Sequence, residues 1–241
     1  MSDFYDRPGV LERYREATAG VSDPQHVMEE PALLEEIGDA RGLRVVDLGC
    51  GDAAIGRTLL DAGCASYLGV DGSVRMVDTA VETLRGTAGE AVRGDITGFS
   101  AAPGTFDLVL SRLALHYVED LDGVLAAARG CLSPGGRIVC STVHPVMTAH
   151  DPREDPDALM TDWVVDDYFD GGPRERRWLG ETVVWHHRTV EDHLAALRRA
   201  GFELTALREC PPRRERFGGD EAEYARRRRI PRFLLLAGRA R

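Results

Sequence analysis

The chain has 241 residues, 43% of them apolar, and can bury one large core, so a single folded domain is expected. Its formal net charge of −10 at pH 7 opposes contact with a phosphate backbone and argues against nucleic acid as a partner. We also expect a cytoplasmic protein with no membrane contact, because no stretch is apolar enough to span a bilayer and the N-terminus does not resemble a signal peptide.

The basic residues indicate origin rather than function. All thirty are Arg, and the chain has no Lys and no Asn, a composition typical of a GC-rich genome such as an actinobacterium's. The basic run at residues 226–229 follows an acidic stretch, so we expect a solvated helix face there. The five cysteines include no C-x-x-C pair, and we predict neither a disulfide framework nor a metal site.

Apolar runs and helical stretches alternate between residues 44 and 143. The runs expected to form strands are residues 44–48, 67–70, 91–92, 106–111 and 137–143, of which 106–111 is expected to be buried. The stretches with helical spacing are residues 53–60, 73–84 and 121–131. In the second helix, the predicted buried stripe is Val74, Val77, Ala80, Val81 and Leu84. This alternation predicts an α/β fold: a Rossmann-like, doubly wound, mostly parallel sheet with helices on both faces.

Two segments lie outside this alternation. One is residues 1–40, with a helix candidate at 28–37; the other is residues 144–189, which hold all three tryptophans and are too long for an ordinary connection. A helix at 190–200, N-capped by Thr189, and strands at 203–207 and 233–237 complete seven strands. We therefore divide the single domain into an N-terminal cap (1–40), a core (41–143), a substrate-covering insertion (144–189) and a C-terminal part (190–241).

The first strand ends in a ligand-binding pattern. Its sequence, VVDLGCGDA, places Asp47 before Gly49 and Gly51, which let the backbone turn sharply and approach a ligand. About twenty residues on, Asp71 ends the second strand, where a carboxylate can bind the two hydroxyls of a ribose. Because parallel strands bind ligands at their carboxyl ends, these residues predict a nucleotide-type site.

These motifs resemble those of the class I S-adenosylmethionine (SAM)-dependent methyltransferases. The segments FDLVLSRLALHYVED and LSPGGRIV extend the resemblance over residues 44–143. It implies SAM as cofactor and S-adenosylhomocysteine (SAH) as product, with Asp47 at the amino group and Asp71 at the ribose. The other implied cofactor contacts are Gly49, Gly51, Gly72, Ser73, Met76, Asp95, Ile96 and Ser111, with Asp95 and Ile96 at the adenine. Ala53 is a departure, since many members have glycine there.

Three other classes of function compete with this interpretation. The turn could be an NAD fingerprint, but Asp47 would repel a pyrophosphate and would attract the ammonium of SAM. An RNA methyltransferase should carry an Asn- or Asp-Pro-Pro-Tyr/Phe motif, and residues 111–114 read Ser-Arg-Leu-Ala instead. A non-catalytic nucleotide-binding module should have lost the acidic and glycine positions, which are all present.

Methyl transfer from a sulfonium mainly requires alignment and exclusion of water, and a base is needed only if the acceptor must lose a proton. The candidate base or positioning residues are His116, Tyr117, His144, His187 (or its neighbour His186) and Tyr14. Three further histidines, His26, His150 and His193, are expected at the surface.

The aromatic insertion suits a flat apolar or aromatic acceptor better than a sugar or a free carboxylate. The segment from residue 168 to residue 212, which contains HHRTVEDHLAALRRAGF, resembles a bacterial, actinobacterial-type small-molecule branch of the family. We expect a small aromatic natural-product acceptor, and favour methylation at a ring carbon or nitrogen, such as the 3-position carbon of an indole. Phenol or enol O-methylation remains the alternative, and the oligomeric state stays open.

Overall fold

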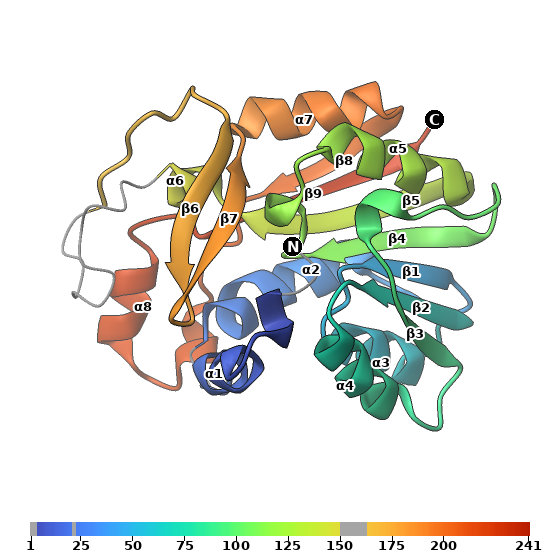
Figure 1. Ribbon diagram of the computed structural model, residues 1–241, viewed down its shortest axis with the longest axis horizontal. Helices are drawn as coiled ribbons and strands as arrows, with labels where there is room; N and C mark the ends of the chain where they lie inside the picture. Colours follow the sequence, from blue (N-terminus) through green and yellow to red (C-terminus); the bar gives the residue numbers. More distant parts are fainter. Residues whose placement is uncertain (1–3, 21–22, 150–162) are drawn as a thin grey trace.

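The computed structural model describes residues 4–20, 23–149 and 163–241. Within these ranges the chain forms a seven-stranded sheet in the order β3-β2-β1-β4-β5-β9-β8 (Figure 1). Its strands are β1 (Arg44–Leu48), β2 (Ser66–Asp71), β3 (Gly89–Arg93), β4 (Phe106–Arg112), β5 (Leu132–Val143), β8 (Phe202–Arg208) and β9 (Phe233–Ala240). Strands β1 to β5 pair in parallel, and β9 runs antiparallel between β5 and β8. The predicted Rossmann-like, mostly parallel sheet is confirmed.

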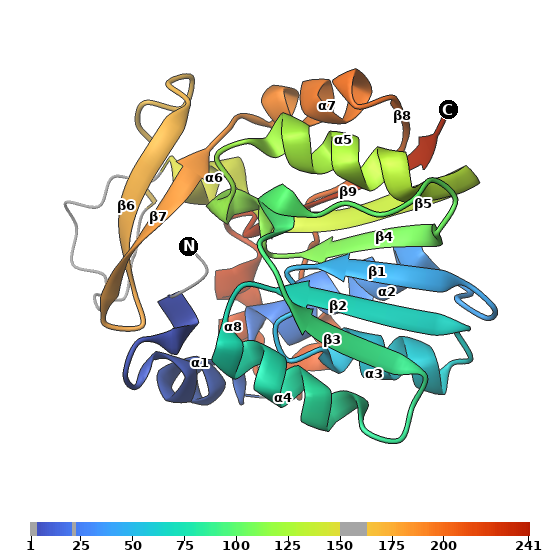
Figure 2. The ribbon, with the colours of Figure 1, turned by 45° about the vertical axis from the view of Figure 1, so that its right-hand side comes forward.

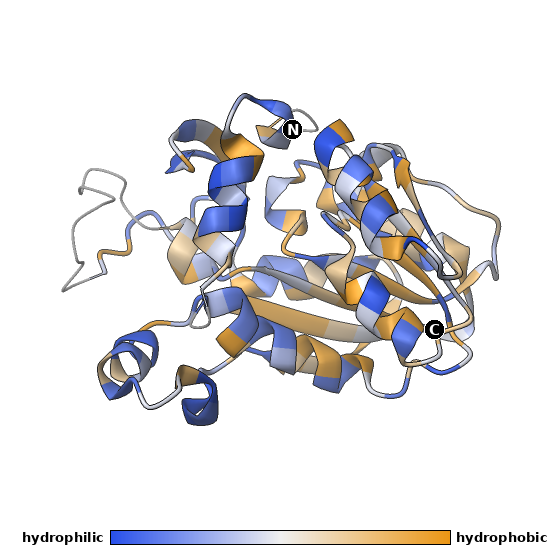
Figure 3. Ribbon diagram, turned by 90° about the horizontal axis from the view of Figure 1, so that it is seen from below, coloured by the Kyte–Doolittle hydropathy of each residue, from blue (hydrophilic) through white to orange (hydrophobic). Residues whose placement is uncertain are grey.

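Helices cover both faces of this sheet, as Figure 2 shows. One face packs against α2 (Glu30–Ile37), α3 (Ala54–Asp61) and α4 (Val74–Leu84). The opposite face packs against α5 (Leu121–Cys131) and α7 (Val190–Arg199). Neighbouring strand residues such as Val45 and Val46 belong to different clusters, because successive side chains of a strand point to opposite faces. The strands are accordingly mainly apolar in Figure 3, while the helices carry both kinds of residue.

The remaining elements surround one end of the sheet. They are η1 (Phe4–Asp6), α1 (Val10–Thr18), the π-helical turn η2 (Gln25–Glu29), η3 (Ile96–Gly98), η4 (Leu115–Tyr117), α6 (Pro145–Thr148), η5 (Arg214–Phe217) and α8 (Glu221–Arg227). Strands β6 (Gly172–Trp178) and β7 (Glu181–His187) form a separate antiparallel hairpin, which the sequence did not predict. Every helix in the described ranges falls short of what a membrane crossing requires.

Three local predictions meet different outcomes. The N-cap at Thr189 is confirmed, because its side chain accepts from the Asp192 amide and the Asp192 side chain accepts from the Thr189 amide. The strand expected at 137–143 begins earlier, at Leu132, where a register shift against β4 accommodates the extra residues. The basic run is not wholly solvated, since Arg227 pairs with Glu223 at 2.6 Å and its side chain is only 13% exposed.

The apolar stripe predicted on α4 was partly wrong. Val74 and Val81 are 41% and 49% exposed, whereas Met76, Ala80 and Leu84 are buried. Residues four apart share one face of a helix, and the face through positions 76, 80 and 84 lies against the sheet. Val74 and Val81 stand at the edge of that face, so the period was predicted correctly but its centre was not.

Gly56 on α3 makes room for Tyr67 of β2. An added Cβ at Gly56 would lie 2.3 Å from Cζ of the buried Tyr67 ring. We predict that Gly56→Ala lowers the free energy of unfolding by about 1–3 kcal/mol, because the ring or the helix must shift. Urea denaturation measures this change.

Gly130→Ala is the matched control for that variant. Gly130 lies on α5, and an added Cβ meets nothing within 4 Å. Its substitution should raise the free energy of unfolding by about 0.5–1 kcal/mol, since Ala loses less entropy than Gly in a helix. Equal changes in the two variants would show that Tyr67 does not depend on Gly56.

Candidate functional site

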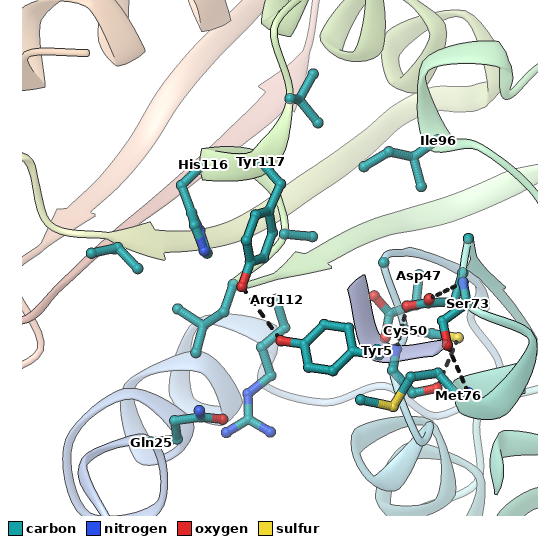
Figure 4. A pocket seen from close by; sticks show the side chains of 18 of the residues that line it. Tyr5, Gln25, Asp47, Cys50, Ser73, Met76, Ile96, Arg112, His116 and Tyr117 are labelled. Carbon is teal, nitrogen blue, oxygen red and sulfur yellow. Dashed lines mark hydrogen bonds between the residues drawn. The ribbon is translucent and has the colours of Figure 1, made fainter. Parts of the chain in front are cut away.

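A cavity of about 360 Å³ lies where β1, β2 and β4 end, and it is bordered by η1, η2 and the β6–β7 hairpin. This volume lies in the range of small-molecule sites, about 300–1,000 Å³. Figure 4 shows Asp47, Ser73 and Met76 on one side, Gln25 and His116 on the other, and the Tyr5 ring between them. The predicted ligand site at the carboxyl edge of the sheet thus coincides with a real cavity.

Asp47 is the buried acid of this cavity. Its side chain is 2% exposed, Oδ2 accepts a 2.8 Å hydrogen bond from the Tyr67 hydroxyl, and Oδ1 has no hydrogen-bond partner among the described residues. Burial raises the pKa of Asp47 to about 6, although the Tyr67 bond lowers it. An unpartnered carboxylate oxygen in a cavity is a site for a cationic or hydrogen-bond-donating ligand group.

The glycine turn after β1 requires its glycines. Gly49 has φ +86°, and an added Cβ would lie 2.3 Å from Cβ of Ala114. Gly51 has φ +55°, with open space where a Cβ would stand, and the turn ends at Ala53 with φ +57°. Glycine adopts this left-handed conformation without strain, which is the physical reason for the glycine that the family resemblance implies where this chain has Ala53.

Asp71 lies at the end of β2 beside this turn. Its Oδ2 accepts from the Gly51 amide and its Oδ1 from the Ser73 amide, both at 2.9 Å. Burial raises the pKa of Asp71, and the two amides oppose that rise. Each oxygen keeps a lone pair, so the oriented carboxylate can accept from two neighbouring hydroxyls of a ligand.

The predicted cofactor residues largely come together around the cavity. Those that line it are Asp47, Gly49, Gly51, Asp71, Gly72, Ser73, Met76, Asp95 and Ile96. Asp95 uses Oδ1 to cap η3 through the Thr97 amide at 3.0 Å. Ser111 is not among the lining residues: it is 1% exposed and donates to the Leu48 carbonyl at 2.8 Å, which ties β4 to β1.

Tyr14, His116 and Tyr117 also line the cavity. The His116 ring packs against the Tyr117 ring at a tilt, with centroids 4.1 Å apart, and meets the Trp185 ring edge-on at 5.3 Å. Burial lowers the pKa of His116 to about 3, and its Nδ1 has no partner among the described residues. The Tyr117 hydroxyl lies 3.4 Å from that of Tyr5, which links β4's loop to the N-terminal cap. His116 is therefore a neutral group that can form a hydrogen bond with a ligand.

The structure does not bring His144 and His187 into this cavity. His144 caps α6, accepting from the Val146 amide at 3.1 Å, while its Nε2 meets Glu209 at 3.2 Å. Both ring nitrogens of the fully buried His187 are occupied, by the Thr148 hydroxyl at 2.6 Å and the Tyr168 carbonyl at 2.8 Å. Neither ring has a nitrogen left for a ligand, so both histidines hold the insertion together.

The three histidines expected at the surface differ in placement. His26 is exposed, with 49% of its side chain accessible. His193 is 5% exposed, which contradicts the prediction, because α7 turns this residue toward the protein interior. His150 lies outside the described residues.

Sequence reasoning missed several cavity residues. Of these, Arg112 pairs with the buried Glu29 at 2.7 Å and with Glu30 at 3.3 Å, and Ser141 donates to Glu29 at 2.6 Å. Asp23, Gln25 and Arg232 also line the cavity without having been predicted. Tyr5, Trp178 and Trp185 line it as well, and lie in the two segments expected to cover the pocket. No local pattern marks the two arginines.

Comparisons with known proteins agree with this geometry. A family model described as a methyltransferase domain matches residues 46–140. The crystal structure of an S-adenosylmethionine dependent methyltransferase from Mesorhizobium loti is 35% identical, and the match covers 91% of this chain and 100% of that one with a TM-score of 0.80. A ubiquinone biosynthesis O-methyltransferase from Ralstonia nicotianae is 32% identical over 57% of this chain, and the match spans 62% of that enzyme. A demethylmenaquinone methyltransferase from Lactococcus lactis is 30% identical over 56% of each chain.

Tyr67→Phe tests the electrostatics of Asp47. The variant removes the hydroxyl that stabilises the carboxylate, so we predict that the pKa of Asp47 rises further above about 6. Carbon-13 NMR titration of the labelled carboxyl group measures it. Tyr224→Phe is the control, because Tyr224 packs on Phe217 away from the cavity. An unchanged Asp47 pKa in Tyr67→Phe would contradict the assigned hydrogen bond.

Proposed function

Because the chain belongs to the class I SAM-dependent methyltransferases, we propose that it methylates a small aromatic acceptor held beside SAM in this cavity. SAM is its methyl donor, and its activity is SAM-dependent methyl transfer. The observation that carries the proposal is the buried Asp47 oxygen without a partner, next to a glycine turn and an oriented second carboxylate.

The residues present fit the cofactor. Asp47 Oδ1 would accept from the ammonium of the methionine part of SAM, and Asp71 from the two ribose hydroxyls. The open space where a Gly51 Cβ would stand lets the backbone of the turn approach the ligand, while Gly49 makes room for Ala114. Gly72, Ser73 and Met76 would border the nucleoside, with Asp95 and Ile96 at the adenine; Ser111 would act only indirectly, by tying β4 to β1.

The acceptor would occupy the other half of the cavity. Its lining there is aromatic: Tyr5, Tyr14, His116, Tyr117, Trp178 and Trp185. Aromatic faces and edges stack on flat ligands, which supports an aromatic natural product as acceptor. The N-terminal cap (1–40) and the insertion (144–189) supply most of this lining, which supports our division into a SAM-binding core with a two-part cover. We further propose that the chain belongs to the bacterial, actinobacterial-type small-molecule branch of the family.

Bound SAM supplies an activated methyl group, and the chain's own residues would orient the acceptor and exclude water. The contact between the hydroxyls of Tyr5 and Tyr117 would hold the N-terminal cap against the loop after β4, and so help to exclude water. His116, with a pKa of about 3, is neutral and a weak base, so it would orient the acceptor through a hydrogen bond. A weak base favours an acceptor that attacks before it loses a proton, such as the 3-position carbon of an indole or a ring nitrogen.

Phenol or enol O-methylation is the second candidate. The relative from Ralstonia nicotianae bears the name of an O-methyltransferase, which supports this alternative. The experiment that decides is incubation of the protein and methyl-labelled SAM with matched indoles and phenols. Mass spectrometry detects the transferred methyl, and NMR of the product locates it on carbon, nitrogen or oxygen. No transfer to any aromatic acceptor would oppose the proposal.

SAH affinity should depend on pH through Asp47. Below a pH of about 6 the empty Asp47 carboxyl takes up a proton, and ammonium binding must then expel it. We predict that the SAH dissociation constant is flat above pH 7 and rises toward about tenfold per unit below pH 6. Calorimetry between pH 5 and 8 measures this dependence.

Asp47→Asn should bind SAH more weakly at neutral pH and lose most of this pH dependence. Asp61→Asn, which alters an exposed ion pair with Arg57 on α3, should keep the wild-type profile. A pH profile of Asp47→Asn that matches the wild type would assign the titration to another group, such as Asp71.

His116 variants separate orientation from proton abstraction. We predict that His116→Leu lowers kcat/KM for the acceptor about 100-fold, because a misplaced acceptor loses alignment. His116→Gln, which keeps a hydrogen-bonding group, should retain more activity and the same pH profile. Steady-state kinetics from pH 5 to 9 measure both. A wild-type titration near pH 6.5 that disappears in His116→Gln would instead assign His116 as the base.

A further inference from the structure

Arg232 reaches the cavity through the antiparallel strand β9. Val143 at the end of β5 pairs with Phe233 at the start of β9, and the His144 amide donates to the Arg232 carbonyl at 2.9 Å. Because β9 runs antiparallel to β5, it begins beside the carboxyl end of β5. The residue before β9 therefore lies at the ligand-binding edge of the sheet. Arg232 there lines the cavity together with Asp23, Gln25 and Met147.

The Arg232 guanidinium has no partner. It makes no ion pair or side-chain hydrogen bond with any described residue, and its Nε is buried. Arg112, which also lines the cavity, is by contrast neutralised by Glu29 at 2.7 Å and Glu30 at 3.3 Å. The charge of Arg112 is thus already paired within the protein, whereas Arg232 lines the cavity without such a pair and can donate hydrogen bonds to a ligand.

The surroundings of Arg232 make an unpaired charge unfavourable. Burial and, to a smaller extent, the nearby charges of Arg227 and Arg226 lower the pKa of Arg232 to about 10. Asp23 and Glu223 oppose this effect without pairing with Arg232. A partly buried cation without a counterion is stabilised by any ligand that brings a negative charge to it.

We propose that Arg232 binds a carboxylate on the methyl acceptor, so that the acceptor is an aromatic acid. The proposal rests on the proposed function, in which the aromatic half of the cavity holds the acceptor. It changes the expectation from the sequence, which disfavoured a free carboxylate because the insertion expected to cover the pocket is aromatic. A guanidinium forms two parallel hydrogen bonds with a carboxylate.

The charge balance of the cavity favours a monoanion. The acidic residues that line it are Asp23, Asp47, Asp52, Asp71, Asp95 and Glu119. One guanidinium can offset a single negative charge among these carboxylates, whereas a phosphate dianion would be repelled. The ammonium of SAM would lie at Asp47, and Arg112 is the arginine whose charge acts on Asp47, so the carboxylate of SAM would lie nearer to Arg112 than to Arg232.

The test is calorimetric titration of the SAH-saturated protein with benzoate, benzamide and phenyl phosphate. Benzoate and benzamide share a ring and differ in charge, and phenyl phosphate distinguishes a phosphate from a carboxylate. We expect benzoate to bind about tenfold or more tightly than either of the other two. Arg232→Gln should remove this preference, and Arg232→Lys should restore part of it.

Arg216→Gln is the matched control, because it removes the same charge from an exposed position on η5 and should leave benzoate binding unchanged. SAH affinity should be the same in wild type and Arg232→Gln, which also shows that the variant folds. Failure of the wild type to bind SAH would overturn the proposed function itself. With SAH bound, equal or absent binding of benzoate and benzamide, tighter binding of phenyl phosphate, or benzoate binding that survives Arg232→Gln would overturn the role of Arg232. Loss of SAH binding in Arg232→Gln would assign this residue to the cofactor instead.

Discussion

The site depends on one buried carboxylate, Asp47, held at the centre of the sheet. The Tyr67 hydroxyl fixes one of its oxygens at 2.8 Å and leaves the other unpartnered in the cavity. Tyr67 can stand there because Gly56 on the covering helix has no side chain. Gly56 thus makes room for Tyr67, and Tyr67 positions Asp47 through a hydrogen bond. A substitution that displaces Tyr67 at Gly56 would therefore also disturb the carboxylate in the cofactor half of the cavity.

Sheet topology builds the rest of the site from distant parts of the chain. Parallel strands bring Asp47 and Asp71 to one edge, because consecutive β-α units return every strand in the same direction. Strand β9 enters antiparallel and starts at that edge, which adds Arg232. The N-terminal cap is joined to the same edge, where Asp6 accepts from the Ser73 hydroxyl at 2.5 Å and from the Arg75 amide at 3.1 Å. The cofactor half and the acceptor half of the cavity therefore both lie along this edge of the sheet.

The sequence correctly predicted those parts of the site whose residues are close together in the chain. The strand, glycine turn and helix around Asp47 lie within about ten residues, and their geometry follows from residue type. Arg232 could not be predicted, since its place depends on the pairing of β9 with β5 across ninety residues of chain. His187 looked available beside the aromatic insertion, but Thr148 and Tyr168, contacts that no periodicity indicates, occupy its ring.

The central claim is that this cavity holds SAM through the carboxylates at the ends of β1 and β2. Calorimetric titration of wild type and Asp71→Asn with SAH tests it most directly, because SAH needs no acceptor and makes no chemical step. We predict one equivalent of SAH bound by the wild type, with affinity reduced about tenfold or more in Asp71→Asn, which keeps the shape of the side chain and loses its charge. No binding by the wild type, or equal binding by both proteins, would contradict the claim.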